Sequence, residues 1–355
     1  MAFDLFTHEE IYGVLSEVVP FKPQLMQHFG NQLNFDTEVI DFDKISDDLR
    51  VSIYVDPALS ARATYERGYS TKKYTAPYTK QKESVNTKRL WKRAAGEPIN
   101  NFRSPAEKYR AALLQAAVDM RTRHLRFMEV QASKLLIAGQ YTAVSELYPA
   151  PVVIDYERNS NNAYNFTTLN ANGGVGKRAW GSTGGTKPVS PIADLEEFLD
   201  ACQEQIEVMY ISEDAWAEVK KDTTFDKLID TTVRQATSLS VELGPKQGTI
   251  QGLKYRGNLV SNNTEIWTYA GTYQDPTSGT ITRFFPLGYV IGVPSSTFGT
   301  IAYGAIQHGG AEYQSFDIFW NMWMEEEFGI PYIQMQSAPM LVHTKINSTF
   351  AHKVM

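Results

Sequence analysis

The sequence predicts an α+β fold, and three observations lead to this prediction. Residues 104–139 carry the pattern of one uninterrupted helix, the clearest element of the chain. The residues after Pro245 are rich in short strand patterns separated by turns. Residues 60–100 interleave tyrosines with basic side chains, and they are rich in strand formers but too polar to build a core alone. Helices and strands therefore occupy different stretches of the chain.

Length and composition exclude several classes of protein. The 355 residues correspond to about two domains, and 43% hydrophobic with 21% charged residues is typical of a globular chain. Cys202 is the only cysteine, which rules out an intrachain disulfide and a small disulfide-stapled secreted scaffold. The first ten residues lack a secretory signal, and Pro286 and Pro294 break the longest uncharged stretch, residues 284–311. We therefore expect a soluble protein that folds in a reducing, intracellular setting.

The first hundred residues predict an arm followed by a protrusion. Pro20 and Pro23 interrupt any long helix in residues 1–49, so an extended or partly helical arm is expected there. The β-branched residues of Arg50–Val55 predict a strand. The polar, aromatic residues 60–100 are typical of a long protruding hairpin or loop.

The long helix has recognisable signals at both ends. Ser104, Pro105 and Glu107 form a capping box with proline in the first turn, and Gly139 supplies the stop. At 1.5 Å per residue this helix is about 50 Å long, so we expect it to span a whole domain. Its predicted core-facing stripe consists of Leu114, Val118, Leu125, Met128, Ala132 and Leu135.

The second half of the chain predicts short helices followed by strands. Residues 159–189 are typical of a long loop with weak strands. Helices are predicted at about 190–207, 213–220 and 225–236. Strands are predicted at 208–211, 249–256, 265–273, 279–285 and 289–293, with one long strand over 332–343.

Charge is distributed unevenly along the chain. The net charge of −6 divides into −8 over residues 1–61, +11 over residues 62–134 and −9 over residues 135–355. Basic residues interleaved with aromatics suit single-stranded nucleic acid, but the acidic remainder of the chain favours docking onto another copy of the protein. We therefore predict an intersubunit contact made by Lys72, Lys73, Lys80, Lys82, Lys88, Arg89, Trp91, Lys92 and Arg93.

No motif predicts catalysis, a metal site or a cofactor. The histidines show no HExxH spacing, and His124, among the arginines of the long helix, is expected to be solvated or partner-facing. Residues 174–179 match GxGxxA but lack the flanking strand and helix that a nucleotide loop needs. The run Glu325–Glu327 is expected to form a solvated or partner-facing acidic patch, because sequence neighbours do not face each other as paired carboxylates do.

Three segments, in their order and spacing, resemble one known family. The first is residues 76–86 (APYTKQKESVN). The second lies within residues 129–142 and consists of EVQA at 129–132 and LLIAGQYT at 135–142. The third is residues 336–341 (QSAPML). These segments resemble the basic loop, the end of the long helix and the C-terminal strand of the major capsid proteins of lambda-type tailed bacteriophages, the capsid E family. The resemblance covers most of the chain.

The resemblance implies the Hong Kong-type capsid fold, also called HK-ninety-seven-like. The predicted elements follow that fold in order. The implied division is an N-terminal arm at 1–49, an extended loop at 50–100, a peripheral domain at 101–190 with its spine helix at 104–139, an axial domain at 191–311 and a return to the peripheral domain at 312–355.

The resemblance also implies a structural function. A major capsid (head) protein assembles as hexamers and pentamers into an icosahedral shell that encloses double-stranded DNA. It belongs to the virion, is assembled in the host cytoplasm, and is no enzyme. The implied partners are further copies of the chain, a separate scaffolding protein, a portal and double-stranded DNA, which is contacted non-specifically. Whether a decoration protein also binds is left open, and no membrane is involved. The alternatives are an encapsulin-like compartment shell and a carbohydrate- or nucleotide-acting enzyme.

Overall fold

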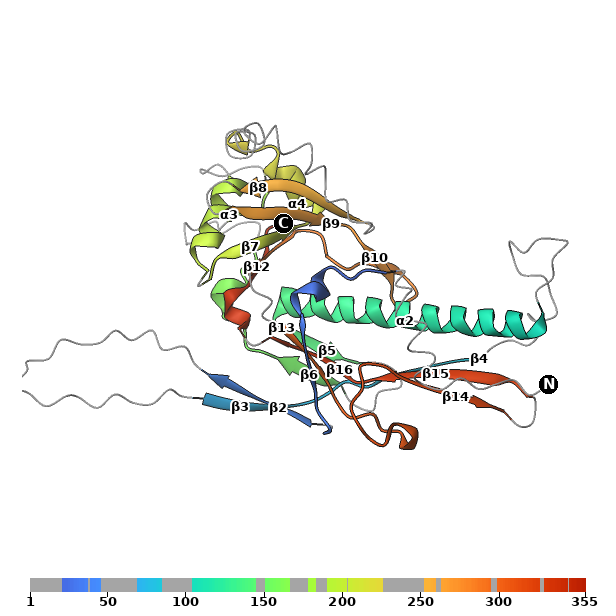
Figure 1. Ribbon diagram of the computed structural model, residues 1–355. Helices are drawn as coiled ribbons and strands as arrows, with labels where there is room; N and C mark the ends of the chain where they lie inside the picture. The colour runs from blue at the N-terminus through green and yellow to red at the C-terminus, as the bar shows by residue number, and fades with distance from the viewer. Residues whose placement is uncertain are drawn as a thin grey trace, which may run out of the picture.

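The structure is a computed structural model, and one long helix organises it (Figure 1). Figure 1 shows this helix, α2 (Pro105–Ala138), with an open sheet and two short helices above its C-terminal half and further strands below it. The structure describes residues 21–37, 39–45, 69–84, 104–144, 151–166, 178–182, 190–202, 204–225, 252–259, 263–294, 299–325, 329–343 and 345–355. The predicted strand at 50–55 and most of the predicted helix at 225–236 lie outside these ranges.

The ends of α2 confirm the predicted helix. The Ser104 hydroxyl accepts the backbone N–H of Glu107 at 3.2 Å, and the Glu107 carboxylate accepts the N–H of Ser104 at 2.8 Å. Gly139 ends the helix with a left-handed φ of 70°. A Cβ at this position would lie 2.8 Å from the Cβ of Arg158, so both the conformation and the space require glycine.

The core-facing stripe of α2 was predicted correctly in its C-terminal half and only in part in its N-terminal half, where Val118 packs against the core cluster of the sheet. Met128, Ala132 and Leu135 are buried as predicted. Leu114, Val118 and Leu125 are only half-buried. Neighbouring helical residues point about 100° apart, and both directions are apolar here, so the sequence pattern alone could not choose between them. The residues that face the sheet in this half are Leu113, Ala117 and Met120.

A three-stranded antiparallel sheet supports the N-terminal half of α2. Its strand order is β14 (Phe319–Met324), β15 (Pro331–Ser337) and β4 (Thr79–Ser84). Ile318, Trp320, Ile333 and Met335 form one core cluster with Leu113 and Met120 of the helix. Residues 79–84, which the sequence analysis assigned to the extended loop, thus lie in this sheet.

A second three-stranded sheet contains β1 (Asn31–Asn34), β13 (Gly299–Tyr303) and β16 (Pro339–His343), in that order. The predicted single strand over 332–343 is wrong, because β15 and β16 belong to different sheets and are separated at the buried Ala338. There the carbonyl of Ala338 accepts the N–H of Gly304 at 3.0 Å. The alternation of the sequence continues through this change of sheet, so it does not reveal the break.

A mixed five-stranded sheet lies above the C-terminal half of α2. Its order is β17 (Phe350–Lys353), β12 (Tyr289–Pro294), β7 (Ile206–Ile211), β9 (Thr264–Tyr269) and β8 (Leu253–Leu259). The helices α3 (Pro191–Asp200) and α4 (Glu213–Val219) pack on it through Ile192, Leu195, Phe198, Ala215, Trp216 and Val219. α3 is shorter than predicted, and β8 begins four residues later than the strand predicted from residue 249.

Three two-stranded ribbons complete the strands described. They are β2 (Val39–Ile45) with β3 (Tyr69–Thr75), β5 (Gln140–Ala143) with β6 (Val152–Asp155), and β10 (Thr272–Gln274) with β11 (Ile281–Arg283). Short 3-10 turns occur at Leu25–His28, Ser160–Asn162, Gly309–Ala311 and Ile346–Ser348. Within the described ranges, no helix combines the length and the apolar character needed to cross a membrane.

Candidate functional site

The β2–β3 ribbon carries the first two of the predicted contact lysines. Its strands pair antiparallel from Val39 opposite Thr75 to Ile45 opposite Tyr69, and Figure 1 shows the ribbon extending away from α2. An isolated two-stranded ribbon is marginally stable in water. The ribbon therefore depends on contacts beyond its own strands.

At its base the ribbon is fastened to β6. The ammonium of Lys72 pairs with the carboxylate of Glu157, and this hydrogen bond raises the pKa of Lys72. The Tyr74 hydroxyl donates to the carbonyl of Asp155, and its ring lies 5.8 Å from that of Tyr156. Lys73 lies 3.4 Å from the carboxylate of Asp41 across the ribbon. Both lysines are thus matched by acids of the same chain, in exposed pairs of the kind that contribute ~0–1 kcal/mol.

Lys80 and Lys82 lie on the open face of β4. Along this strand half-buried and exposed residues alternate, and both lysines are exposed. The Nζ of Lys82 lies 3.9 Å from the ring centre of Tyr332 and 5.0 Å from that of Trp323. These two rings are stacked 5.6 Å apart, so Lys82 already has a cation–π site within its own subunit. Its neighbour Glu83 points to the other face and pairs with Arg123 of α2 at 3.3 Å.

The predicted contact residues therefore divide between two places. Lys72 and Lys73 belong to the ribbon, whereas Lys80 and Lys82 belong to the sheet under α2. Ala76 and Pro77, which separate β3 from β4, are buried, and this Ala-Pro pair was the sequence signal for the break. The remaining predicted residues, Lys88, Arg89, Trp91, Lys92 and Arg93, lie outside the described residues.

A buried carboxylate of α2 binds residues 24–26, and none of the sequence-based predictions assigned it a role. Glu129 is fully buried and accepts the backbone N–H groups of Gln24, Leu25 and Met26 at 3.0, 3.0 and 3.1 Å. Burial raises the pKa of this carboxyl, while the N–H groups act in the opposite direction. A charged residue on the buried side of a predicted helix was the signal that could have marked it.

His28 contacts the five-stranded sheet close by. The Nε2 of His28 lies 2.9 Å from the hydroxyl of Tyr210 on β7. Burial lowers the pKa of His28 to about 4, so this imidazole is neutral at pH 7. Residues 24–28 thus connect α2 to the five-stranded sheet.

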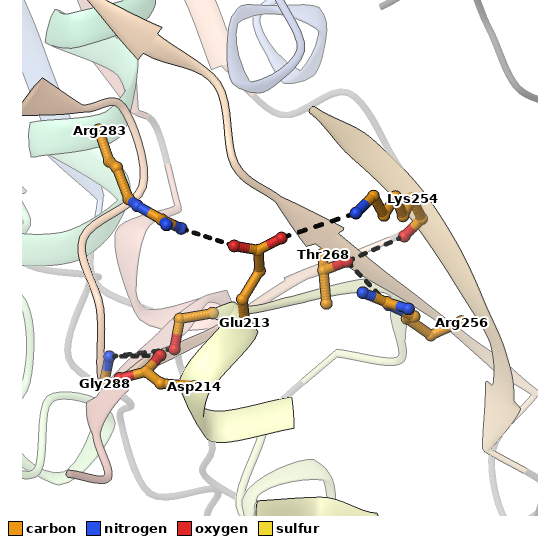
Figure 2. A network of polar contacts seen from close by, with 8 residues as sticks. Glu213, Asp214, Lys254, Arg256, Thr268, Arg283 and Gly288 are labelled. Atoms are coloured by element: carbon orange, nitrogen blue, oxygen red, sulfur yellow. Dashed lines mark hydrogen bonds and ion pairs between the residues drawn. The ribbon is translucent and has the colours of Figure 1, made fainter. Parts of the chain in front are cut away.

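A network of ion pairs holds the β10–β11 hairpin to α4 (Figure 2). Figure 2 shows Glu213 between the guanidinium of Arg283, at 2.9 Å, and the ammonium of Lys254, at 3.8 Å. Beside it, the N–H of Gly288 donates to Asp214 at 3.1 Å. These carboxylates are occupied by cations and N–H groups, so the network fastens β8, β11 and α4 together.

His124 corrects the expectation of a solvated or partner-facing side chain. It is 2% exposed, and neither ring nitrogen has a hydrogen-bond partner. Burial, with a smaller effect of the Arg121 charge, lowers its pKa to about 4. The arginines around it in sequence point to other sides of the helix, and the imidazole occupies the sheet-facing stripe as a neutral ring.

The predicted acidic patch and glycine motif are described only in part. Glu325 accepts the hydroxyl of Tyr332 at 3.2 Å, whereas Glu326 and Glu327 lie outside the described residues. Most of residues 174–179 also lies outside them. In the part of the chain that the structure describes, no three His, Cys, Asp or Glu side chains gather as metal ligands would.

Comparison with known proteins decides the family. The family described as phage major capsid protein E matches residues 7–354. The chain belongs to this family. It is 23% identical to the major capsid protein of Escherichia phage lambda over 345 residues, which cover 95% of this chain and 96% of that protein. It is 24% identical to the major capsid protein of Enterobacteria phage phi80 over 346 residues, with the same coverage.

Solved structures confirm the fold of this capsid protein. A crystal structure ascribed to the capsid protein of an E. coli CFT073 prophage superposes with a TM-score of 0.71 at 17% identity, covering 99% of both chains. A phage-related protein from Bordetella bronchiseptica RB50 superposes with a TM-score of 0.52 at 9% identity, covering 98% of this chain and 97% of that one. The predicted α+β, HK-ninety-seven-like capsid fold is confirmed, and so is the predicted class of function, a structural protein of the phage virion.

Proposed function

We propose that this capsid protein assembles as hexamers and pentamers into a closed icosahedral shell around double-stranded DNA. The match of the capsid family to residues 7–354 carries the proposal. The β2–β3 ribbon supports it, because a ribbon of two strands that extends away from the body gains stability by lying on a neighbouring subunit. The shell is a structural assembly without enzymatic activity, built in the host cytoplasm.

The proposed division of the subunit follows its sheets. The proposed N-terminal arm is residues 1–49, and the proposed extended loop is residues 50–100. The peripheral domain is residues 101–190, with α2 as its spine, and the axial domain is residues 191–311. Residues 312–355 return to the peripheral domain. Two strands refine these bounds. β4 pairs with β15 under α2, which adds residues 79–84 to the peripheral domain, and β17 pairs with β12, which adds residues 350–353 to the axial domain.

The proposed contact between subunits is electrostatic in part. Residues 62–134 carry a net charge of +11, while the segments before and after them are acidic. Lys80 and Lys82 are exposed on one face, and Lys72 and Lys73 are held only by exposed pairs that can exchange partners. Exposed pairs contribute ~0–1 kcal/mol each, but every subunit repeats them around a shell.

The proposed partners are a separate scaffolding protein, a portal, a decoration protein and the packaged DNA, contacted non-specifically. Electron microscopy of particles purified from phage-producing cells tests the function. DNA-filled heads are expected. Small shells that hold protein cargo instead would favour the encapsulin-like alternative, and a protein that forms no shell, with a turnover of its own, would contradict the structural function.

A further inference from the structure

Residues 155–158 contact both the β2–β3 ribbon and the C-terminal end of α2. Figure 1 shows β5 and β6 between that end of the helix and the ribbon. The Tyr74 hydroxyl donates to the carbonyl of Asp155, and the ammonium of Lys72 pairs with the carboxylate of Glu157. Because both contacts hold the base of the ribbon, any displacement of the ribbon acts first on these residues.

The next residue, Arg158, caps α2. Its Nη1 donates to the carbonyls of Leu136 and Ile137 at 2.8 and 2.9 Å, and these belong to the last carbonyls of the helix, which have no partner within it. Its Nη2 donates to the hydroxyl of Thr349, directly before β17, at 2.9 Å. Arg158 thus joins the end of α2 to the edge strand of the five-stranded sheet.

The backbone of Glu157 is strained. Its φ is 54°, in the left-handed region that a residue with a Cβ rarely adopts. Such a conformation persists where the surrounding structure holds it. Here the N–H of Glu157 donates to the carboxylate of Asp155 at 2.8 Å, and its side chain pairs with Lys72 of the ribbon. The strained residue is therefore bound to the ribbon and directly precedes the residue that caps α2.

The conformation of Glu157 determines where Arg158 lies. Rotation of residue 157 to a negative φ would redirect the chain at Arg158 and move its guanidinium away from the carbonyls of α2. The position of Arg158 leaves little freedom for adjustment, because a Cβ added at Gly139 would lie 2.8 Å from the Cβ of Arg158. The left-handed conformation and the cap on α2 therefore form and break together.

We propose that Glu157 is a conformational latch between the β2–β3 ribbon and the end of α2. While Lys72 pairs with it, residue 157 stays left-handed and Arg158 stays on the carbonyls of the helix. When the ribbon is drawn away from β6, the pair breaks, residue 157 relaxes to a negative φ, and the last turn of α2 and the contact with Thr349 loosen. The latch is a property of the single subunit, so it goes beyond the shell function and does not depend on it.

Hydrogen–deuterium exchange of the unassembled subunit tests the role of the strain. Glu157→Ala and Glu157→Gly both remove the carboxylate, but only glycine adopts a positive φ without cost. The probes are the amides of Gly139 and Tyr156, which donate to the carbonyls of Leu135 and Gly139 at 2.8 and 3.1 Å. We expect Glu157→Ala to accelerate exchange at both probes about fivefold and Glu157→Gly to do so much less. No acceleration in Glu157→Ala, or an equal or larger one in Glu157→Gly, would overturn the proposal.

The ribbon side of the latch is tested by two neighbouring lysines. Lys72→Glu repels Glu157, whereas Lys73→Glu serves as the matched control, because Lys73 pairs with Asp41 inside the ribbon at 3.4 Å. We expect Lys72→Glu alone to accelerate exchange at Gly139, by about fivefold, and to lose this effect when it is combined with Glu157→Gly.

Three outcomes would contradict the latch. They are equal effects of the two lysine variants, an effect of Lys72→Glu that persists with glycine at position 157, and an equal acceleration at the amide of Leu125. This last amide lies in the middle of α2 and reports opening of the whole helix rather than of its end.

Discussion

The carboxylate of Glu129, in the middle of the long helix, accepts the backbone N–H of Leu25 at 3.0 Å, and both residues are fully buried. The same carboxylate accepts two further N–H groups, from Gln24 and Met26, so one side chain caps the short turn at Leu25–His28. This turn lies where α2 meets the five-stranded sheet (Figure 1). Residues 24–26 are thereby joined to the core by a side chain that follows Leu25 by 104 residues along the chain.

Glu129→Ala is expected to destabilise the subunit strongly. The change leaves two buried N–H groups and one partly buried N–H group without their acceptor, and each unsatisfied buried group costs ~1–3 kcal/mol. Glu129→Gln keeps one carbonyl oxygen and should cost less. Urea unfolding of the unassembled subunit measures both, with the exposed Lys134→Ala as control. An unfolding midpoint unchanged from the parent in Glu129→Ala would show that the arm is held by other contacts.

Leu135 and Leu125 lie on different sides of α2, and their truncation should affect stability differently. Leu135 is fully buried in the main core cluster, and Leu135→Ala should cost ~2–5 kcal/mol and lower the yield of soluble subunit. Leu125→Ala, at a half-buried position, should cost less, and Arg123→Ala should leave the yield unchanged because its pair with Glu83 is exposed. Comparison of soluble yields and unfolding midpoints provides the measurement. Equal losses for Leu125 and Leu135 would mean that both sides of the helix are equally packed.

Charge reversal of Lys80 should affect shell assembly alone, whereas charge reversal of Lys82 should affect both assembly and subunit stability. Lys80→Glu changes an exposed residue of β4, so we expect impaired shell assembly with an unchanged unfolding midpoint. Lys82→Glu removes the cation over Tyr332 and Trp323 as well, and should lower subunit stability by ~0.5–1 kcal/mol. Light scattering of assembly and urea unfolding measure the two effects.

The triple reversal of Lys80, Lys82 and Lys88 to Glu should block shell formation while the subunit still folds. High salt should weaken early shells for the same reason, because it screens exposed pairs. If the triple variant instead formed intact empty shells and failed only to retain DNA, these lysines would serve DNA binding rather than contact between subunits.

His124 should make the subunit sensitive to acid. In the unfolded chain an imidazole has a pKa of ~6.5, whereas burial lowers that of His124 to about 4. Between these values the unfolded chain binds a proton that the folded chain does not, so the free energy of unfolding decreases as the pH falls through this window. The full effect of one such group is of the order of 3 kcal/mol.

His124→Leu tests this pH dependence. The change keeps an apolar side chain in the stripe and removes the titrating group, so the loss of stability between pH 6.5 and 4 should become smaller. Part of the loss should remain, because burial lowers the pKa of His28 to about 4 as well. Urea unfolding at several pH values gives the slopes, and a slope identical to that of the parent would contradict the prediction.

The sequence predicted correctly those features that depend on residues close together in the chain. The capping box at Ser104 and the glycine stop at Gly139 act within one or two turns, so the sequence defined both ends of α2. The order of strands in the sheets could not be predicted from such signals. β7 pairs with β9, more than fifty residues away, and β4 pairs with β15, from Ser84 opposite Tyr332 to Thr79 opposite Ser337, segments far apart in the chain. Such pairings depend on the packing of the whole chain.

The candidate contact surface shows the same division. The basic character of residues 62–134 is a property of the sequence and needed no structure. That Lys72 pairs with Glu157 and that Lys82 lies over Tyr332 are contacts between distant segments, and they show that part of this charge is matched within the subunit. The family segments around residues 76–86 and 129–142 were recognisable, but not the acceptor role of Glu129 inside one of them.

The sequence by itself determined the α+β class, the long capped helix, the uneven charge and the resemblance to phage capsid proteins, because each is carried by neighbouring residues. The tertiary structure decided which side of α2 is buried, where β15 gives way to β16, and that Glu129 and His124 are both enclosed. On one helix, Leu113 and Leu114 are equally apolar and point about 100° apart. Only the sheet that packs on one of those directions distinguishes a core residue from one left at the surface.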